Sequence, residues 1–415
     1  MHYEKGSKNI WLPYTQMKNH LPQLEVKTAK GSTIFLEDGR SLIDAISSWW
    51  SMAHGYNHPH LIKEITRQAS ELPHVMLAGC ANKATYQLSH RLCKFTEMDR
   101  VFFSDSGSVA VEVAMKIAWQ YHINCDAKDK TKFISFKNSY HGDTTGAMSL
   151  ADLDVGMHQK FQQLLLHNFS LDLPKTQSEL NAFEQFIIKN KNLLAGIFVE
   201  PLVQCAGGML FHDPKTLRAI FDIAKKHDVL FIADECAVGF YRLGTKFACD
   251  QAGIKPDILV LGKALTGGTI SLAATLVQDK IFEAFLSDSL DSALMHGPTF
   301  MGNALASAAA NASLDLFETV DYAANVLAIE KILKTELDKC SDIKIVKDVR
   351  VLGALGVLEL DVSWEDILDL RQKFVKDGVF LRPFGNCLYI MPALNIEESE
   401  LKVITDSIFK ILTNT

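Results

Sequence analysis

Short apolar runs alternate with amphipathic stretches along most of the chain. Continuous runs such as 229–233 (VLFIA) and 258–261 (ILVL) are typical of strands buried on both faces of a parallel sheet. The stretch 109–121 (VAVEVAMKIAWQY) is strongly amphipathic, and the pattern of 60–98 is also helical. Strands that alternate with helices and end in polar residues predict an α/β fold, with a mostly parallel sheet between layers of helices.

The two ends of the chain have a different pattern. Alternating stretches at 24–28 and 32–36 predict a hairpin, and short strands and helices after residue 320 predict an α+β unit. We therefore expect residues 1–55 and 299–415 to form a small domain, and residues 56–298 to form a large domain that holds the ligand. The weakly periodic region 150–177 is expected to be a surface excursion.

Composition narrows the classes of function. The chain has 415 residues, 48% of them hydrophobic and 22% charged, which is ordinary for a soluble globular protein. Its net charge of -7 disfavours nucleic acid or an anionic membrane as a partner. The eight cysteines include no C-x-x-C spacing, and the chain has no long apolar segment or cleavage signal. We expect a cytoplasmic protein with reduced thiols, no structural metal and no membrane span.

Two of the buried runs end beside side chains that could take part in catalysis. Asp234 follows the first run and Lys263 follows the second, and ligands of open α/β sheets bind at the carboxyl ends of strands. A lysine amine can form an imine with an aldehyde, while a carboxylate can hold a pyridine nitrogen protonated. This pair suits pyridoxal 5'-phosphate. The alternative is an ordinary ion pair between Asp234 and Lys263.

A possible phosphate site lies between another strand and helix. The run 100–103 leads into 104–108 (SDSGS) and then into the amphipathic helix, so Gly107 and Ser108 would stand at a helix N-terminus that attracts an anion. Plain N-capping explains the serines equally well. The chain has no G-x-G-x-x-G after a strand and no P-loop motif, which favours a monophosphate over a nucleotide.

Aromatic residues accompany these groups. Tyr140 and His141 follow the strand 132–136, where a ring could stack on a planar cofactor, although a simple turn with a satisfied histidine is the alternative. Trp49 and Trp50 are adjacent and must point in different directions. At least one of them is expected to line a pocket, unless the pair belongs to an interface.

Taken together, these motifs resemble those of the class III, fold-type I pyridoxal-phosphate aminotransferases over nearly the whole chain. The specific matches are D-E-x-x-x-G-F-x-R-x-G at 234–244, G-K-A-L-T-G-G at 262–268 and S-Y-H-G-D at 139–143. Further motifs resemble those of one branch of this family. The enzymes of that branch transaminate 8-amino-7-oxononanoate in biotin biosynthesis, with S-adenosylmethionine as amino donor. They are W-L-P-Y-T-Q (11–16), S-W-W (48–50), D-S-G-S-V-A-V-E-V-A-M-K (105–116), H-G-P-T-F-M-G-N (296–303) and R-P-F-G (382–385).

The resemblance implies a homodimer and a role for each matched residue. Lys263, Asp234 and Tyr14 would be catalytic, and Thr299 would reach the phosphate of the neighbouring subunit. The implied cofactor residues are Gly107, Ser108, Tyr140, His141, Asp234, Lys263, Pro298 and Thr299. The implied substrate residues are Tyr14, Trp49, Trp50, Tyr140, Asp143, Arg242, Gly297, Arg382 and Tyr389, with Arg382 holding the substrate carboxylate.

The sequence is also compatible with other functions. One is a class III aminotransferase for ω-amino acids such as ornithine or 4-aminobutyrate, against which the paired tryptophans and Arg382 argue. Another is a scaffold that binds the cofactor without catalysis. Val238, Cys205 and Tyr241 depart from the pattern of the class and could reshape the donor side of the pocket. The choice between S-adenosylmethionine and lysine as donor is therefore left open.

Overall fold

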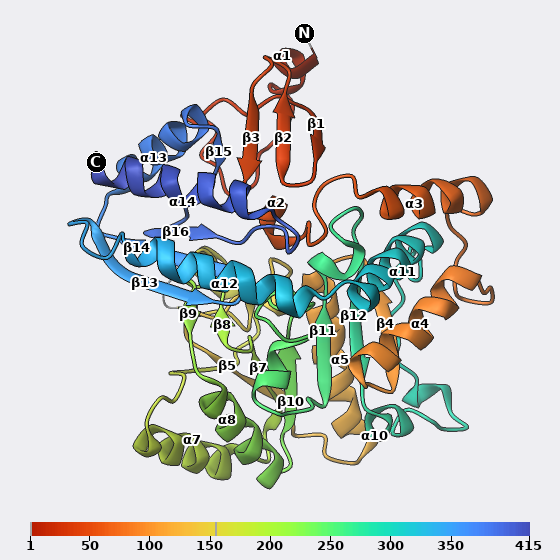
Figure 1. Cartoon of the computed structure of the whole chain (residues 1–415). Helices are drawn as coiled ribbons and strands as arrows, with labels where there is room; N and C mark the ends of the chain where they lie inside the picture. Colours follow the sequence, from red (N-terminus) through yellow and green to blue (C-terminus); the bar gives the residue numbers. More distant parts are fainter. Residues whose placement is uncertain (1, 154–155) are drawn as a thin grey trace.

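A computed structural model describes residues 2–153 and 156–415, and its largest sheet has seven strands (Figure 1). The order is β4-β12-β11-β10-β7-β5-β6, and every strand runs in the same direction except β12. The strands are β4 (Arg100–Ser104), β5 (Lys132–Phe136), β6 (Phe169–Leu171), β7 (Leu194–Val199), β10 (Leu230–Asp234), β11 (Ile258–Leu261) and β12 (Ala273–Val277). The predicted α/β class with a mostly parallel sheet is confirmed.

Helices cover both faces of this sheet, which is why its strands are apolar on both sides. Along β10, Leu230 and Ile232 pack with α5 on one face, and Phe231 and Ala233 pack in the core with α4, α8 and α11 on the other. The helices of this part are α3 (Pro59–Glu71), α4 (Lys83–Thr96), α5 (Gly107–Asn124), α6 (Thr145–Met148), α7 (Gln177–Asn190), α8 (Pro214–Lys226), α9 (Ala248–Gln251), α10 (Asp279–Glu283) and α11 (Ala304–Thr319).

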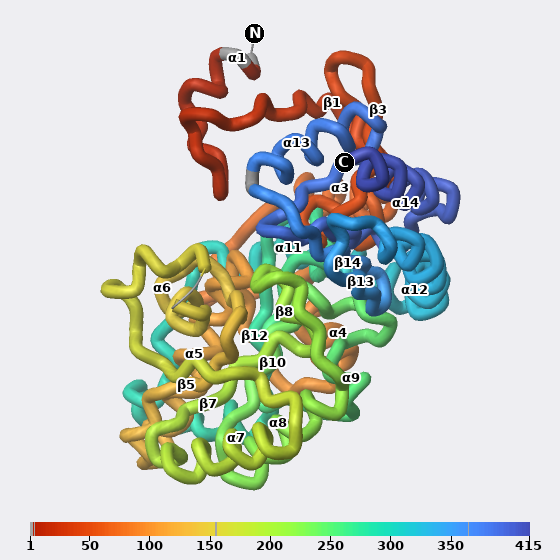
Figure 2. The backbone as a smooth tube through the Cα atoms, turned by 90° about the vertical axis from the view of Figure 1, so that its left-hand side faces the viewer, coloured from red at the N-terminus to blue at the C-terminus, as the bar shows by residue number. Residues whose placement is uncertain are grey.

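The two ends of the chain meet in a second, four-stranded sheet of order β1-β2-β3-β15. Its strand β3 pairs in parallel with β15, with Ile43 opposite Val379. Figure 2 shows these first strands, in red, beside the last helices, in blue. The strands are β1 (Val26–Lys30), β2 (Thr33–Leu36), β3 (Ser41–Asp44) and β15 (Val379–Phe380). The domain boundaries at 55/56 and 298/299 stay predictions.

A three-stranded antiparallel sheet and three helices complete the C-terminal part. They are β13 (Val346–Leu352), β14 (Leu355–Leu360), β16 (Cys387–Ile390), α12 (Tyr322–Asp338), α13 (Trp364–Lys376) and α14 (Glu398–Thr413). The short elements are α1 (His2–Gly6), α2 (Ser47–Trp50), η1 (Gln159–Leu164), β8 (Val203–Gln204), β9 (Leu210–Phe211), η2 (Lys263–Thr266) and η3 (Leu290–Ser292). Across residues 2–153 and 156–415, none of the helices has the length and apolar character needed to cross a bilayer.

The helical pattern of 60–98 is confirmed as two helices, α3 and α4. They are separate because α3 ends before Pro73, which has no N–H to donate and disfavours helical backbone at Leu72. The region 150–177 is more than a surface excursion. Its strand β6 extends the central sheet, with Phe169 opposite Ile134, and His158 is buried.

Candidate active site

The central sheet brings Asp234 and Lys263 to one cavity of about 230 Å³. Asp234 ends β10, and Lys263 lies two residues beyond the end of the adjacent parallel strand β11. In the described parts of the chain no salt bridge joins the two groups, so they do not form the ordinary ion pair. Lys263 has a φ of 43°, in the left-handed region that side chains rarely adopt. Such strain is concentrated at functional positions.

Asp234 is held by two donors. Its Oδ2 lies 2.8 Å from Nδ1 of His141, and its Oδ1 accepts from the backbone N–H of Cys236 at 3.1 Å. Burial lowers the pKa of His141, but the hydrogen bond and negative charge of Asp234 outweigh it, and the pKa of His141 lies above its ordinary value. The carboxylate can only accept, so Nδ1 of His141 donates. This arrangement fixes an anionic oxygen at the floor of the cavity.

The N-terminus of α5 forms another wall of the same cavity. Ser106 caps the helix, accepting at Oγ from the backbone N–H of Val109 at 3.4 Å, so capping explains this serine. Gly107 and Ser108 open the helix and line the cavity. A Cβ on Gly142 would lie 2.2 Å from Cβ of Ser108, so glycine lets the loop at 142 approach the first turn of α5. The first turn of α5 thus offers N–H groups and a positive dipole end to an anion.

Tyr140 lines the cavity and is anchored through its backbone. Its N–H donates to Oε1 of Glu200 at 2.9 Å, and its hydroxyl lies 3.2 Å from that of Tyr14. Burial raises the pKa of Glu200 to about 7. Glu200 was not among the predicted site residues. The signal was present, because Glu200 directly follows the buried strand β7 just as Asp234 ends β10.

Asp143 lies at the mouth of the cavity and accepts from two side chains. The hydroxyl of Tyr14 donates to Oδ2, and Nε2 of His158 lies 3.0 Å from Oδ1. The hydrogen bond from His158 is the main reason that the pKa of Asp143 is lowered. The His158 ring also stacks on that of Tyr140, with centroids 5.7 Å apart. His158 was not among the predicted site residues, because it lies in the weakly periodic stretch 150–177.

The two tryptophans point to different places, as predicted. Residues 47–50 all have positive φ, and Asp44 holds this turn by accepting from the N–H groups of Ile46 and Ser48 at 2.9 and 2.8 Å. Trp50 is buried and lines the cavity, with its ring centroid 5.2 Å from Nζ of Lys263. Trp49 is 37% exposed and lines a second cavity instead.

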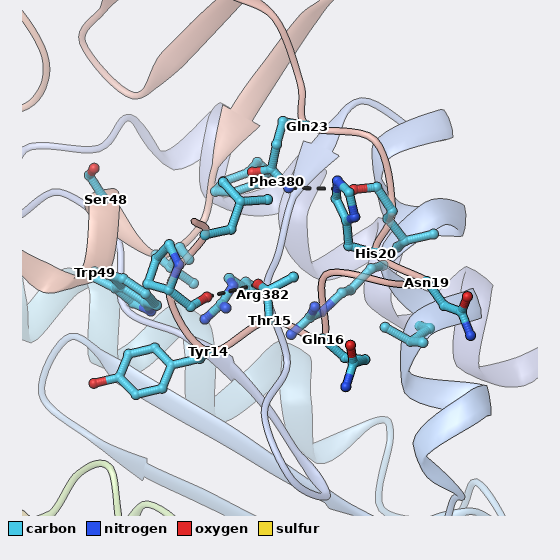
Figure 3. Close-up of a pocket in the computed structure, with 16 residues that line it drawn as sticks. Tyr14, Thr15, Gln16, Asn19, His20, Gln23, Ser48, Trp49, Phe380 and Arg382 are labelled. Carbon is cyan, nitrogen blue, oxygen red and sulfur yellow. Dashed lines mark hydrogen bonds between the residues drawn. The ribbon is translucent and has the colours of Figure 1, made fainter. Parts of the chain in front are cut away.

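This second cavity, of about 350 Å³, lies between the N-terminal segment and the C-terminal part (Figure 3). Tyr14, Trp49 and Arg382 line it. The guanidinium carbon of Arg382 is 4.6 Å from the ring centroid of Trp49, a cation–π distance. Tyr14 contacts Asp143, which lines the first cavity, so the two cavities adjoin at Tyr14.

The remaining predicted residues do not line either of these two cavities in the described chain. Arg242 is buried, donates from Nη1 to the carbonyl of Pro392, and has a pKa that burial lowers to about 9. Tyr389 is buried behind Trp50, with ring centroids 6.0 Å apart. Gly297, Pro298 and Thr299 lie in the loop before α11, and Thr299 is exposed.

Known proteins resemble this chain over nearly its full length. Adenosylmethionine-8-amino-7-oxononanoate aminotransferase of Buchnera aphidicola subsp. Schizaphis graminum (strain Sg) is 41% identical, over 98% of this chain and 96% of that protein. The crystal structure of adenosylmethionine-8-amino-7-oxononanoate aminotransferase from Methanocaldococcus jannaschii DSM 2661 has a TM-score of 0.95 and 33% identity, covering 100% of this chain and 99% of that one. An amine transaminase from an uncultivated Pseudomonas species, solved in a PLP-bound form, has a TM-score of 0.89 and 27% identity, with 98% of each chain covered.

The first cavity fits pyridoxal 5'-phosphate. Asp234 supplies an anion for a ring nitrogen, Lys263 an amine for an aldehyde, and the first turn of α5 a site for a phosphate, all on one cavity. Gly142 approaches Ser108 so closely that there is no room for a side chain at position 142.

The family assignment covers almost the whole chain. Residues 14–412 match the family described as Aminotransferase class-III. The first cavity lies wholly inside this range, and the second lies inside it except for Leu12 and Pro13. The chain belongs to the class III aminotransferases, which use pyridoxal 5'-phosphate.

Proposed function

We propose that this protein transfers an amino group from S-adenosylmethionine to 8-amino-7-oxononanoate, giving 7,8-diaminononanoate in biotin biosynthesis. The observation that carries the proposal is the pair of adjoining cavities, one holding Lys263 and Asp234 and the other ending at Arg382. The printed names of the relatives support the choice of substrate.

Lys263 is the residue that holds the cofactor and moves the proton. Its Nζ accepts a proton from the carbon that carries the donor's amino group and later returns a proton to the acceptor carbon. Asp234, oriented by His141, keeps a proton on the ring nitrogen. When bound, pyridoxal 5'-phosphate acts as an electron sink for the reacting carbon.

Other side chains bind and orient. Gly107 and Ser108 hold the phosphate, and Tyr140 and Trp50 enclose the reacting groups. A long apolar keto acid would lie along Tyr14 and Trp49, with its carboxylate on Arg382. Asp143 would face the polar end of the substrate, because Tyr14 and His158 fix its position.

We also propose that two copies complete each site. In this arrangement Thr299, with Gly297 and Pro298, reaches the phosphate bound by the neighbouring subunit. In support, the adjacent segment exposes large apolar side chains that a second copy would cover: Leu286, Leu290, Met295 and Phe300. The eight free cysteines support a cytoplasmic location.

The test is product formation by the purified holoenzyme. With S-adenosylmethionine and 8-amino-7-oxononanoate, mass spectrometry should detect 7,8-diaminononanoate, and lysine is tried in parallel as the donor. Lys263→Ala should abolish both the turnover and the visible absorbance of the lysine-linked cofactor, whereas Lys255→Ala, at an exposed lysine, should preserve them. Amination of 2-oxoglutarate but not of the oxononanoate would establish an ω-amino-acid aminotransferase instead.

The shared site has a test of its own. A dimer formed from one Lys263→Ala chain and one Thr299→Ala chain contains one fully intact site, provided that Thr299 serves the other subunit. Mixing the two impaired variants should therefore give more activity than either variant gives alone. If Thr299 served its own subunit, every site of the mixture would carry one defect and activity would stay low.

A further inference from the structure

The turn that carries Trp49 and Trp50 has an uncommon backbone. Ser47, Ser48, Trp49 and Trp50 all have positive φ, from 42° to 73°. Trp49, with φ 58° and ψ 47°, has the dihedral angles of a left-handed helix. This conformation is unfavourable for L-residues and normally occurs at single positions. Four such residues in succession, none of them glycine, require a strong local constraint.

Asp44, at the end of β3, supplies this constraint. Its side chain is buried and accepts from three donors: the N–H of Ile46 at 2.9 Å, the N–H of Ser48 at 2.8 Å and the hydroxyl of Tyr56 at 2.7 Å. Tyr56 is itself fixed, because its backbone exchanges two hydrogen bonds with that of Gly31, at 2.7 and 3.1 Å. The four-stranded sheet and the turn between β1 and β2 thus hold the carboxylate, and the carboxylate holds the start of the turn 47–50.

This turn divides its two rings between the two cavities. Trp50 lines the first cavity, 5.2 Å from Nζ of Lys263, whereas Trp49 lines the second, 4.6 Å from the guanidinium carbon of Arg382 (Figure 3). Because the two residues are adjacent in the chain, one backbone conformation sets both walls. A turn that relaxed to right-handed backbone would redirect both rings, since the direction of a side chain follows from the dihedral angles of its backbone.

We propose that Asp44 is a positioning residue for the acceptor substrate. In the proposed function, on which this inference rests, the long keto acid lies along Trp49 with its carboxylate on Arg382. Asp44 is not among the residues that line either cavity, so it acts through the turn, by keeping the two rings in the conformation that binds the acceptor. Only molecules with the turn in place bind the acceptor, and the apparent affinity falls in proportion to their fraction.

The variant D44N tests this, with D38N as its matched control. Asparagine keeps the shape of the side chain but presents an amide N–H₂ in place of one acceptor oxygen, so at least one hydrogen bond of the turn is lost. D44N should raise KM for 8-amino-7-oxononanoate about tenfold, the usual effect of losing a charged hydrogen bond. It should keep kcat within about twofold, because saturating acceptor selects the molecules with the turn in place. Asp38 is exposed between β2 and β3 and pairs with Arg40, so D38N should leave both constants unchanged.

A second variant covers the case in which D44N does not fold. Y56F removes one donor and leaves the carboxylate, so it should raise KM for the acceptor about threefold and retain kcat. A residue that only stabilised the fold would behave differently: its loss would lower kcat, through the amount of folded enzyme, and leave KM unchanged. An unchanged KM in every variant that folds would overturn the proposal.

Fluorine NMR distinguishes this inference from the proposed function. The holoenzyme with 5-fluorotryptophan at its five tryptophan positions gives a resonance for each, and W49F and W50F assign two of them by their loss. D44N should shift the resonances of Trp49 and Trp50 and leave that of Trp119, in α5, in place. The measurement needs no turnover, so shifted resonances without amination of the oxononanoate would refute only the proposed reaction. Unchanged resonances of Trp49 and Trp50 in D44N would refute the role of Asp44, whatever the enzyme transaminates.

Discussion

His158 places its Nε2 3.0 Å from Oδ1 of Asp143, while the Tyr14 hydroxyl donates to the other oxygen of the same carboxylate. The carboxylate is therefore held from two sides at the mouth of the first cavity. The His158 bond is the largest cause of the lowered pKa of Asp143, so His158 favours the ionised form of this carboxylate.

Replacing His158 by phenylalanine should raise the pKa of Asp143. His158→Phe keeps a ring against Tyr140 but removes the donor to Asp143, so the pKa of Asp143 should rise. The acid limb of the profile of kcat/KM against pH should then move to higher pH, with a loss of about three- to tenfold at the acid end of the profile. The matched control is His167→Phe, at an exposed position of the same region. Superimposable profiles for wild type and His158→Phe would refute this role.

Gly142→Ala should weaken cofactor binding. A Cβ there would lie 2.2 Å from Cβ of Ser108, and the φ of 124° is itself unfavourable for alanine. We expect the affinity for pyridoxal 5'-phosphate to fall at least about tenfold, as overpacking costs about 1–3 kcal/mol. Titration of the apoenzyme, followed by visible absorbance, measures it. Gly39→Ala is the control, because Gly39 also has positive φ but no atom within 4 Å of the added Cβ. Equal affinities of wild type and Gly142→Ala for the cofactor would contradict this prediction, because the loop would then have moved to accommodate the added Cβ.

Asp234→Asn should lower kcat by about 10²-fold or more, because the carboxamide carries no charge to oppose a protonated ring nitrogen. The same change should reduce the pKa of His141, which the hydrogen bond and charge of Asp234 raise. The rate of the single-turnover absorbance change after addition of the amino donor measures the loss of catalysis directly. Asp222→Asn, on the exposed side of α8, should leave the rate unchanged. A rate within twofold of wild type for Asp234→Asn would contradict the assigned role.

His54 should make stability depend on pH. It is buried between the Tyr322 hydroxyl at 2.6 Å and Oγ of Ser313 at 2.9 Å, and burial lowers its pKa to about 3. The unfolded chain binds a proton near pH 6.5, so the stabilising effect of neutral His54 is present above that pH. It is lost progressively as the pH falls from there toward the folded pKa.

The variant His54→Gln removes this titration. Between pH 7.5 and 5.5, wild type should lose about 1.4 kcal/mol more free energy of unfolding than the variant. Urea unfolding of the apoprotein at both pH values measures the difference, and His90→Gln, at an exposed residue of α4, should behave as wild type. Equal losses in wild type and His54→Gln would show that His54 already takes up a proton in the folded state.

Much of the large sheet could be predicted, because its strands are buried on both faces and are therefore continuous apolar runs. β12 was missed, since AATLV is short, weakly apolar and antiparallel to its neighbours. The end of α3 was predictable from Pro73 and was overlooked. The start of α4 was also visible, because Asn82 caps it by accepting from the N–H of Thr85.

Some residues of the site could likewise be predicted from the sequence, and others could not. Asp234 and Lys263 were predictable because strand direction alone brings the ends of β10 and β11 together. His158 was not predictable, because its position depends on the path of an irregular loop. The roles of Gly297 and Thr299 stay predictions, since they concern the neighbouring subunit.

The parallel pairing of β3 with β15 also sets the order in which the molecule can be completed during synthesis. Ile43 leaves the ribosome more than three hundred residues before its partner Val379. The first-made strands must therefore wait, with one edge open, until almost the entire polypeptide has emerged. Trp49 and Arg382 both line the second cavity, so a nascent chain cannot complete this cavity before α13 and the residues up to Arg382 are made.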